Sequence, residues 1–204
     1  MIVIVDSGVS NVRSVANMLR KAGVPAVVTT DPSRIADAVK LILPGVGAFD
    51  AGMRAIRELG LRDVLDCKVM AEGTPVLGIC LGMQLMATRS EEGAEPGLGW
   101  IDADCVRFRF PAGTEARKVP HMGWNVLDLA TPSPLFAGLT GEARYYFVHS
   151  FHLACRRDED VLARATYGYP FAASVGHGNV YGVQFHPEKS HRFGMALLQR
   201  FAAL

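Results

Sequence analysis

Short apolar runs alternate with helical patterns through the first half of the chain. Uninterrupted apolar runs predict buried strands at residues 2–5, 27–30, 41–43 and 75–79. Apolar residues at intervals of three and four predict helices at about residues 12–22, 50–59 and 81–87. Fully apolar strands that alternate with helices are typical of a parallel sheet covered on both faces.

The ends of these elements carry local signals. Ser10 or Asn11 is a plausible N-cap of the first helix, and Gly23 is expected to stop it. The third strand is predicted to end at Pro44.

The pattern of apolar and polar positions changes after about residue 100. Between the strands that follow, no helix long enough to connect parallel strands is predicted. Strands are predicted at residues 106–108, 145–149, 161–165, 171–175 and 180–185. Residues 176–179 predict a hairpin turn, and a last helix is expected at about residues 190–201. We therefore predict an α/β fold: a central, mostly parallel sheet flanked by helices, with an antiparallel extension of the same sheet in the C-terminal half.

Composition narrows the class of protein. Half of the residues are hydrophobic, which excludes intrinsic disorder. The 21 Lys and Arg nearly balance the 20 Asp and Glu, so a nucleic-acid coat is excluded. The longest apolar stretch, residues 74–88, is shorter than the roughly 18–20 residues that span a bilayer, and the N-terminus does not resemble a signal peptide. We expect a single cytoplasmic domain over residues 1–204, with no membrane and no nucleic-acid partner.

Cysteine is the first candidate for chemistry. The four cysteines have neither the close spacing of a zinc site nor that of a redox dithiol, and no metal site or cofactor is predicted. In a reducing cytosol they should be free thiols. Cys67, Cys105 and Cys155 lack any motif and are interpreted as packing residues.

Cys80 lies where the pattern predicts a sharp turn from a strand into a helix. Glycines stand two residues before and after it, in Gly78-Ile79-Cys80-Leu81-Gly82, which is a nucleophile elbow with cysteine in place of serine. Such a turn brings neighbouring backbone too close for a Cβ at either glycine. It exposes the sulfur at the carboxyl edge of the sheet, where the helix N-terminus favours a thiolate. The alternative is a buried cysteine between two packing glycines.

A thiolate nucleophile needs a base, and the base needs a group that orients it. Of the six histidines, only His186 sits in a context that supplies this third group, in His186-Pro187-Glu188. Pro187 helps to keep the segment extended, and alternate residues of an extended segment face the same side. Glu188 can then reach one imidazole nitrogen while the other faces Cys80. Alone, the pattern also fits an exposed His-Pro turn; beside Cys80 it predicts an acyl-transfer triad.

A glycine-containing turn follows the third predicted strand, in Pro44-Gly45-Val46-Gly47-Ala48. Backbone N–H groups in such a turn can approach a ligand oxygen closely. Together with the N–H of Leu81, the N–H of Gly47 is a candidate oxyanion hole, which usually contributes more to the catalysis of acyl transfer than any other single feature. The alternative is an ordinary turn at a strand end.

The segments G-I-C-L-G-M-Q at residues 78–84 and Q-F-H-P-E at residues 184–188 resemble class I, triad-type glutamine amidotransferases. Four more segments make the chain similar to the glutaminase subunits of imidazole glycerol phosphate synthase: P-G-V-G-A-F at 44–49, H-M-G-W-N at 121–125, Y-F-V-H-S at 146–150 and P-E-K-S at 187–190. The similarity covers nearly the whole chain. It departs from the family's D-Y-G-x-G-N loop, where Ser7 and Ser10 replace the aromatic residue and the second glycine while Asn11 is kept.

The resemblance implies a reaction and a set of binding residues. Cys80 attacks the side-chain amide of glutamine to give a γ-glutamyl thioester and ammonia, while His186 shuttles the proton and Glu188 orients it. Gln84 and Glu92 hold the amino-acid end of glutamine, and the backbone around His149 and Ser150 helps with its carboxylate.

The resemblance also implies a partner, a separate cyclase subunit with a (β/α)₈ barrel, in a heterodimer. Ammonia would pass to that subunit, which makes imidazole glycerol phosphate and aminoimidazole carboxamide ribotide in histidine biosynthesis. Asn11, Trp124, Tyr146 and Lys189 are assigned to the interface with it. The alternative for Trp124, Tyr146 and Lys189 is a place in the core.

Three other functions remain open. The chain could be the glutaminase of a different synthase, which a test for complex formation with the cyclase would reveal. It could be a stand-alone cysteine hydrolase of γ-glutamyl peptides, which should turn over without a partner. It could also be a non-enzymatic α/β domain with Cys80 as a redox sensor, which leaves His186 and Glu188 without a purpose.

Overall fold

The computed structural model describes residues 1–8, 10–110, 117–139 and 142–204. Strands and helices alternate through the first half, in the order β1 (Ile2–Val5), α1 (Val12–Lys21), β2 (Ala26–Thr29), α2 (Pro32–Ala36), β3 (Lys40–Gly45), α3 (Phe49–Glu58), α4 (Arg62–Asp66), a π-helical turn (Cys67–Ala71), β4 (Val76–Cys80) and α5 (Leu81–Leu85). This alternation is the predicted one, with the short helices α2 and α4 in addition.

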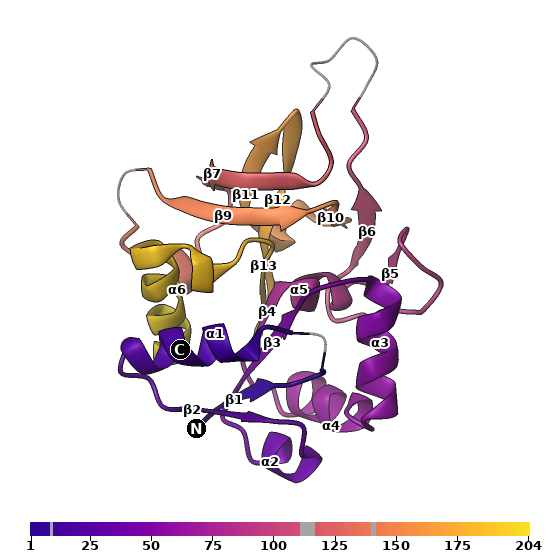
Figure 1. The fold of residues 1–204 in the computed structure, drawn as a ribbon, viewed down its shortest axis with the longest axis vertical. Helices are drawn as coiled ribbons and strands as arrows, with labels where there is room; N and C mark the ends of the chain where they lie inside the picture. Colours follow the sequence, from indigo (N-terminus) through magenta and orange to yellow (C-terminus); the bar gives the residue numbers. More distant parts are fainter. Residues whose placement is uncertain (9, 111–116, 140–141) are drawn as a thin grey trace.

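Strands dominate the second half of the chain. The elements are β5 (Arg89–Ser90), β6 (Ala103–Arg107), β7 (His121–Val126), β8 (Asp128–Leu129), β9 (Arg144–His149), β10 (Phe151–Cys155), β11 (Val161–Tyr167), β12 (Tyr169–His177), β13 (Val180–Val183) and α6 (His191–Ala203), with 3₁₀ turns at Pro134–Phe136, Asp158–Asp160 and Pro187–Lys189. In Figure 1, β7, β9, β11 and β12 lie in the upper part, whereas α6 lies beside α1.

One large sheet runs through the described part of the chain, in the order β2-β1-β3-β4-β13-β12-β10-β6-β5; β11 pairs with β12 beside this path, and β8 pairs with β11. The strands from β2 to β13 pair in parallel. From β13 onwards the pairs with β12, β10 and β6 are antiparallel. The predicted α/β class, with a mostly parallel central sheet and an antiparallel C-terminal part, is confirmed.

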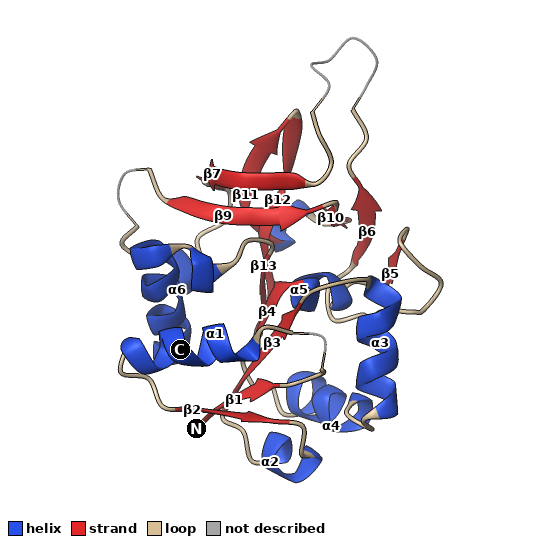
Figure 2. Ribbon diagram, viewed as in Figure 1, coloured by secondary structure: helices blue, strands red, loops and turns tan. Residues whose placement is uncertain are grey.

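Helices cover both faces of the parallel strands (Figure 2). Alternate residues of β1 belong to two different hydrophobic clusters, one on each face of the sheet, because successive side chains of a strand point to opposite faces. Val3 and Val5 pack with α3 and α4, whereas Ile2 and Ile4 pack with α1 and α6. The uninterrupted apolar runs of the sequence therefore reflect two buried faces. No helix among the described residues is long and apolar enough to cross a membrane.

Two predictions about strands were wrong. β3 does not end at Pro44 but continues to Gly45, which lies opposite Cys80 in the register with β4. Proline is tolerated at position 44 because β3 pairs with β1 only as far as Ile42. On the side of β1, therefore, no hydrogen bond between strands needs the N–H that proline lacks.

The second correction concerns β9, which does not extend the large sheet. It pairs with β7 in a separate two-stranded antiparallel sheet, with His121 opposite His149 and Trp124 opposite Tyr146. β7 was not predicted, because the H-M-G-W-N segment does not alternate cleanly between apolar and polar residues. This small sheet lies across the carboxyl end of the parallel strands in Figure 1 and closes one side of the pocket described next.

Candidate active site

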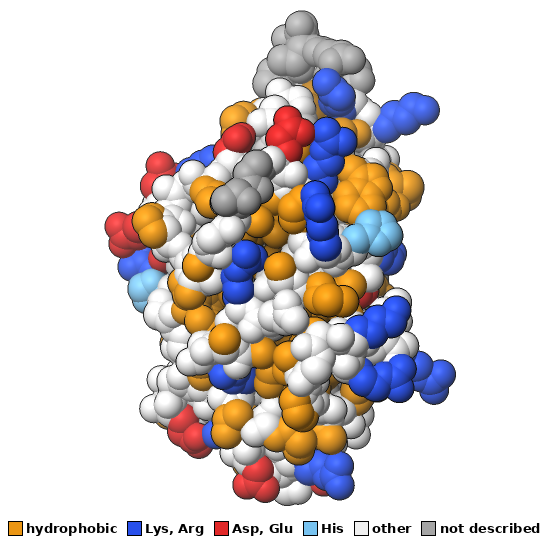
Figure 3. Space-filling model, turned by 90° about the vertical axis from the view of Figure 1, so that its left-hand side faces the viewer, with side chains coloured by type: hydrophobic (Ala, Val, Ile, Leu, Met, Phe, Trp, Pro, Cys, Tyr) orange, Lys and Arg blue, Asp and Glu red, His pale blue; other side chains and the backbone are white. Residues whose placement is uncertain are grey.

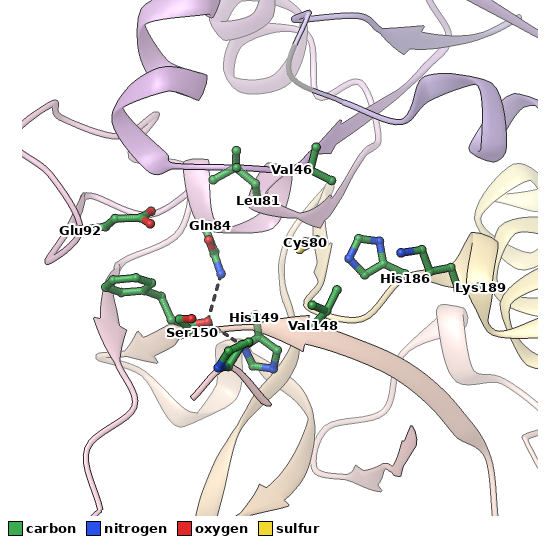
Figure 4. A pocket seen from close by; sticks show the side chains of 13 residues that line it. Val46, Cys80, Leu81, Gln84, Glu92, Val148, His149, Ser150, His186 and Lys189 are labelled. Atoms are coloured by element: carbon green, nitrogen blue, oxygen red, sulfur yellow. Dashed lines mark hydrogen bonds between the residues drawn. The ribbon is translucent and has the colours of Figure 1, made fainter. Parts of the chain in front are cut away.

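A pocket of about 340 Å³ lies where the parallel strands β3 and β4 end. The elbow after β4, the turn after β3, the end of β9 and the segment after β13 converge on it (Figure 4). The predicted site residues that line it are Gly47, Cys80, Leu81, Gln84, Glu92, His149, Ser150, His186 and Lys189. Glu188 lies behind His186, and the predicted interface residues Asn11, Trp124 and Tyr146 lie outside the pocket.

Cys80 occupies a strained position at the elbow. β4 ends at Cys80 and α5 begins at the next residue, so the chain reverses within one residue, which has φ 54° and ψ −111°. Non-glycine residues with positive φ are uncommon and concentrate at functional sites. A Cβ on Gly82 would overlap the carbonyl oxygen of Leu43, and one on Gly78 would lie 2.7 Å from the Met83 nitrogen. The predicted need for both glycines is confirmed.

His186 and Glu188 form a buried pair next to Cys80. The Nδ1 of His186 lies 2.7 Å from Glu188 Oε1, and the two side chains are only 3% and 4% exposed. The carboxylate accepts from Nδ1–H, which leaves Nε2 available to the sulfur. Nε2 is buried, and no described residue lies within ordinary hydrogen-bonding geometry of it. Burial lowers the pKa of the imidazole, but the interactions with Cys80 and Glu188 outweigh it and raise the pKa to about 9.

The backbone around the pair is only partly as expected. His186 is extended, with φ −100° and ψ 99°, but Pro187 begins a 3₁₀ turn that contains Glu188. The glutamate therefore reaches the imidazole from a turn and not along an extended segment, so that detail of the prediction was wrong.

Ser190 holds this turn against β9, a role that the sequence did not suggest. The Ser190 hydroxyl donates to His186 O at 2.6 Å and accepts from Tyr146 N at 3.0 Å, and His186 N donates to Tyr146 O at 2.9 Å. The base is thus tied to β9 by three bonds. The only signal was the place of Ser190 in the P-E-K-S segment.

Gly47 lines the same pocket as Cys80. Its φ is 98°, a conformation that disfavours any side chain, although no atom lies within 4 Å of the position that a Cβ would take. The neighbouring Val46 is 42% exposed. Glycine is needed here for its backbone conformation, whereas Gly82 is needed for lack of space.

Two predicted substrate residues already have partners in the protein. The Nε2 of Gln84 donates to Phe151 O and to Gln184 Oε1, both at 3.0 Å. Glu92 Oε2 accepts from the N–H of Phe49, the first residue of α3, at 2.8 Å. Both residues line the pocket, and the Gln84 oxygen and the Glu92 carboxylate can still accept from a ligand.

His149 is held by a chain of buried groups. Its Nδ1 lies 2.8 Å from Phe151 O, so that nitrogen carries the proton, and Nε2 accepts from His121 Nδ1 at 3.0 Å. Asn125 Nδ2 lies 3.4 Å from the other nitrogen of His121. Burial lowers the pKa of His149 to about 3 and that of His121 to about 4, so both imidazoles stay neutral. With both ring nitrogens engaged, His149 has only its backbone left for a substrate.

The predicted interface residues lie on the outside of this region. The Trp124 side chain is 48% exposed, stacks on His191 with ring centroids 5.4 Å apart, and meets Tyr146 edge-on. Lys189 Nζ lies 5.5 Å above the same Tyr146 ring. These residues are therefore not core residues of the chain. Figure 3, turned to show the left-hand side of the molecule, has Lys and Arg side chains among apolar ones on that face.

Asn11 lies apart from that aromatic group. It is exposed at the start of α1 and, with His186 and Glu188, lines a small hollow behind the triad. The hydroxyl of Ser10, one of the two family departures, is buried. The altered loop thus adjoins the group that orients the base.

The remaining cysteines lie outside the pocket. Cys105 is buried and Cys155 is partly buried, and burial raises the pKa of both thiols to about 12. Cys67 is exposed, so the prediction that it is a packing residue was wrong. Within the described ranges no group of three or more His, Cys, Asp or Glu side chains could hold a metal ion.

Known proteins resemble this chain over its whole length. The family described as glutamine amidotransferase class-I matches residues 3–203. Imidazole glycerol phosphate synthase subunit HisH 2 of Pseudomonas aeruginosa is 51% identical over 204 residues, 100% of both chains. The protein of the same name from Methanococcus maripaludis is 48% identical over 201 residues, 98% of each chain.

The fold also matches solved structures. A chain of the PurLQS structure from Thermotoga maritima superposes with a TM-score of 0.73 and covers 98% of this chain and 96% of that chain. At 21% identity the match establishes a common architecture only.

Proposed function

This chain belongs to the class-I glutamine amidotransferase family, and on that premise we propose that it is the glutaminase subunit of an imidazole glycerol phosphate synthase in histidine biosynthesis. The observation that carries the proposal is that Cys80 and His186 line one pocket while Glu188, behind His186, lies 2.7 Å from its Nδ1. The similarity over the full length to synthase subunits supports the choice of synthase.

The chemistry follows from this arrangement. The Cys80 thiolate attacks the side-chain amide carbon of glutamine, and the oxygen that becomes negative accepts from the N–H groups of Gly47 and Leu81. Protonated His186 gives its proton to the leaving nitrogen, so ammonia departs and a γ-glutamyl thioester remains. His186 then takes a proton from water, which attacks the thioester and releases glutamate. Glu188 holds His186 in the tautomer that points Nε2 at these reacting atoms.

A partner subunit receives the ammonia. We assign to it a (β/α)₈ cyclase that forms a heterodimer with this chain and makes imidazole glycerol phosphate and aminoimidazole carboxamide ribotide. The exposed Trp124, with Tyr146 and Lys189 beside it, forms an aromatic and cationic anchor of the kind that dominates protein interfaces. Asn11 is assigned to the same interface. The four thiols are free, which suits a reducing cytoplasm.

The isolated chain is expected to be a poor glutaminase that the partner activates. The device is the Val46–Gly47 peptide, whose N–H must point at the developing oxyanion. The positive φ of Gly47 and the open space around it allow this peptide to turn between two orientations at small steric cost. Loss of one oxyanion donor costs on the order of 10²–10³ in rate, an amount within reach of binding energy from an interface and a ligand.

The test is glutamate release from glutamine by the chain alone, with the cyclase, and with the cyclase and its nucleotide ligand. We expect at least about a hundredfold rise in the liganded complex. Cys80→Ala is the control: it should abolish synthesis from glutamine and leave synthesis from added ammonia. Equal turnover with and without the partner would instead favour the stand-alone γ-glutamyl hydrolase.

A further inference from the structure

The sulfur of Cys80 has a second polar neighbour besides His186. Gln184 Nε2 donates to Cys80 Sγ at 3.8 Å, and the Gln184 side chain is completely buried. Gln184 follows β13 directly and precedes His186 by two residues, and both side chains interact with Cys80. Phe185 between them packs on Tyr145, with ring centroids 4.0 Å apart.

The orientation of the Gln184 amide is determined by a backbone carbonyl. Phe151 O can only accept, so the atom of Gln84 that lies 3.0 Å from it must be the amide nitrogen. The same nitrogen donates to Gln184 at 3.0 Å, and the atom that receives this bond must be the Gln184 oxygen. The nitrogen of Gln184 is then the atom that faces the sulfur. A flipped amide would set two donors against each other and an oxygen against the thiolate.

We propose that Gln184 is a further catalytic residue, whose amide N–H stabilises the Cys80 thiolate and holds its sulfur in the attacking orientation, and that Gln84 is the positioning residue that fixes this amide. A buried thiolate needs hydrogen-bond donors to replace water. The N–H donor of His186 is lost when its proton passes to the leaving nitrogen. The amide N–H of Gln184 stays in place throughout the reaction. The proposal rests on the proposed glutaminase function, in which Cys80 is the nucleophile.

The proposal predicts a change in thiolate formation that needs neither glutamine nor a partner. The full chain is treated with iodoacetamide over a range of pH, and the alkylation rate of each cysteine is read by peptide mass spectrometry. Gln184→Met keeps the length of the side chain and removes the donor. Its Cys80 rate curve should shift to higher pH by about one unit, the equivalent of a tenfold loss of thiolate stabilisation.

Two references accompany this measurement. Cys67 is exposed and is alkylated in the same sample, so its curve should not move. Gln199→Met, on the exposed face of α6, is the matched control for the substitution itself. Gln184→Leu serves if Gln184→Met does not fold, because it also removes the donor; its Cys80 curve should shift in the same direction.

The variant Gln84→Met distinguishes two roles of Gln84, the positioning of the Gln184 amide and the binding of glutamine. If it fixes the Gln184 amide, Gln84→Met shifts the Cys80 curve in the same direction, by less than Gln184→Met. If it only binds glutamine, the variant raises KM and leaves the alkylation curve unchanged, which would overturn its positioning role. In the complex with cyclase, Gln184→Met should lower kcat about tenfold with little change in KM.

An alkylation curve for Gln184→Met that coincides with that of the unaltered chain would overturn the proposal. Failure of the unaltered complex to hydrolyse glutamine would count against the proposed function alone, since alkylation does not depend on it.

Discussion

In the parallel half of the molecule the site is shaped by backbone contacts, whereas in the antiparallel half it is shaped by hydrogen bonds between buried side chains. At the end of β4, Gly78 and Gly82 leave no room for a methyl group, and the elbow that results presents Cys80. Across the pocket, Glu188 and Ser190 hold the base through side-chain oxygens.

The two kinds of construction respond to different changes. Close backbone packing is intolerant of added volume but carries no charge, so pH should not affect it. Buried imidazoles and carboxylates depend on protonation, because each bond requires one tautomer or charge state. The parallel half should therefore fail on the addition of a methyl group, and the antiparallel half on a change of pH.

The largest effect is expected at the elbow. In Gly82→Ala the new Cβ overlaps the Leu43 carbonyl, so β3 and α5 must separate. We expect the free energy of unfolding to fall by about 3 kcal/mol or more, with loss of glutaminase activity, measured by chemical denaturation and turnover.

Gly60→Ala is the matched control, because Gly60 has φ 65° and no atom within 4 Å of the Cβ position. It should lose only about 1–2 kcal/mol from its backbone conformation. Equal stabilities for the two variants would contradict the steric account of the elbow.

The next largest effect tests the side-chain half. His186→Ala should reduce glutamine turnover in the complex by about 10²–10⁴-fold, the usual contribution of a general acid–base group. Glu188→Gln should retain more activity, because the amide oxygen can still accept from His186 Nδ1–H. It should also lower the pKa of His186 from about 9, since one of the groups that raise it loses its charge.

A fully active His186→Ala enzyme would remove this histidine from the mechanism. The pH dependence of glutamine turnover in Glu188→Gln checks the expected fall in the pKa of His186.

A smaller effect is expected at Gly47, which lies in the parallel half but is free of contacts. Gly47→Ala should fold with a loss of about 1–2 kcal/mol, because φ 98° strains a side chain. Glutamine turnover in the liganded complex should fall by about a hundredfold, the cost of one oxyanion donor. Unchanged turnover with unchanged stimulation by the partner would exclude the Val46–Gly47 peptide as the device.

A further effect is expected in the dependence of stability on pH. The pKa values of His121 and His149 fall to about 4 and 3 on folding, so the folded state binds fewer protons than the unfolded state below pH 6.5. Their contribution is complete above pH 6.5 and is lost as the pH falls, by about 1.4 kcal/mol per unit for each histidine. His186 has the opposite sign, because its raised pKa of about 9 stabilises the fold at low pH and loses that effect as the pH rises toward 9.

The measurement is urea denaturation between pH 7 and pH 4 for the unaltered chain and for His121→Phe, which places an aromatic ring between Phe147 and Tyr167. The variant should show a shallower slope, by about 1.4 kcal/mol per pH unit. His191→Asn, at an exposed position with φ 48°, should leave the slope unaltered. Parallel slopes for all three chains would show that His121 is not held neutral.

The local parts of the fold could be predicted from the sequence. Burial alone determines the apolar runs of β1 and β4 and the periodicity of α1 and α3. Burial on one or both faces of an element produces a regular pattern of apolar residues, which can be read in the sequence. The elbow could be recognised from a local motif, because its two glycines stand two positions from Cys80, although the space at Gly82 is limited by the Leu43 carbonyl of β3. The separation of β7 and β9 from the large sheet could not be predicted, since which strands pair depends on contacts between segments far apart in sequence.

What the sequence by itself determined was the α/β class, the elbow with its two glycines, and the identity of a cysteine, a histidine and a glutamate suited to acyl transfer. Only the tertiary structure decided which buried groups meet them: Gln184 at the sulfur, Ser190 behind the base, and His121 on His149. The physical reason is that hydrophobic periodicity and turn motifs involve residues that are neighbours in the chain. A hydrogen bond such as that from Gln84 to Gln184, 100 positions apart, exists only once strand order and register have placed both amides in the same buried space.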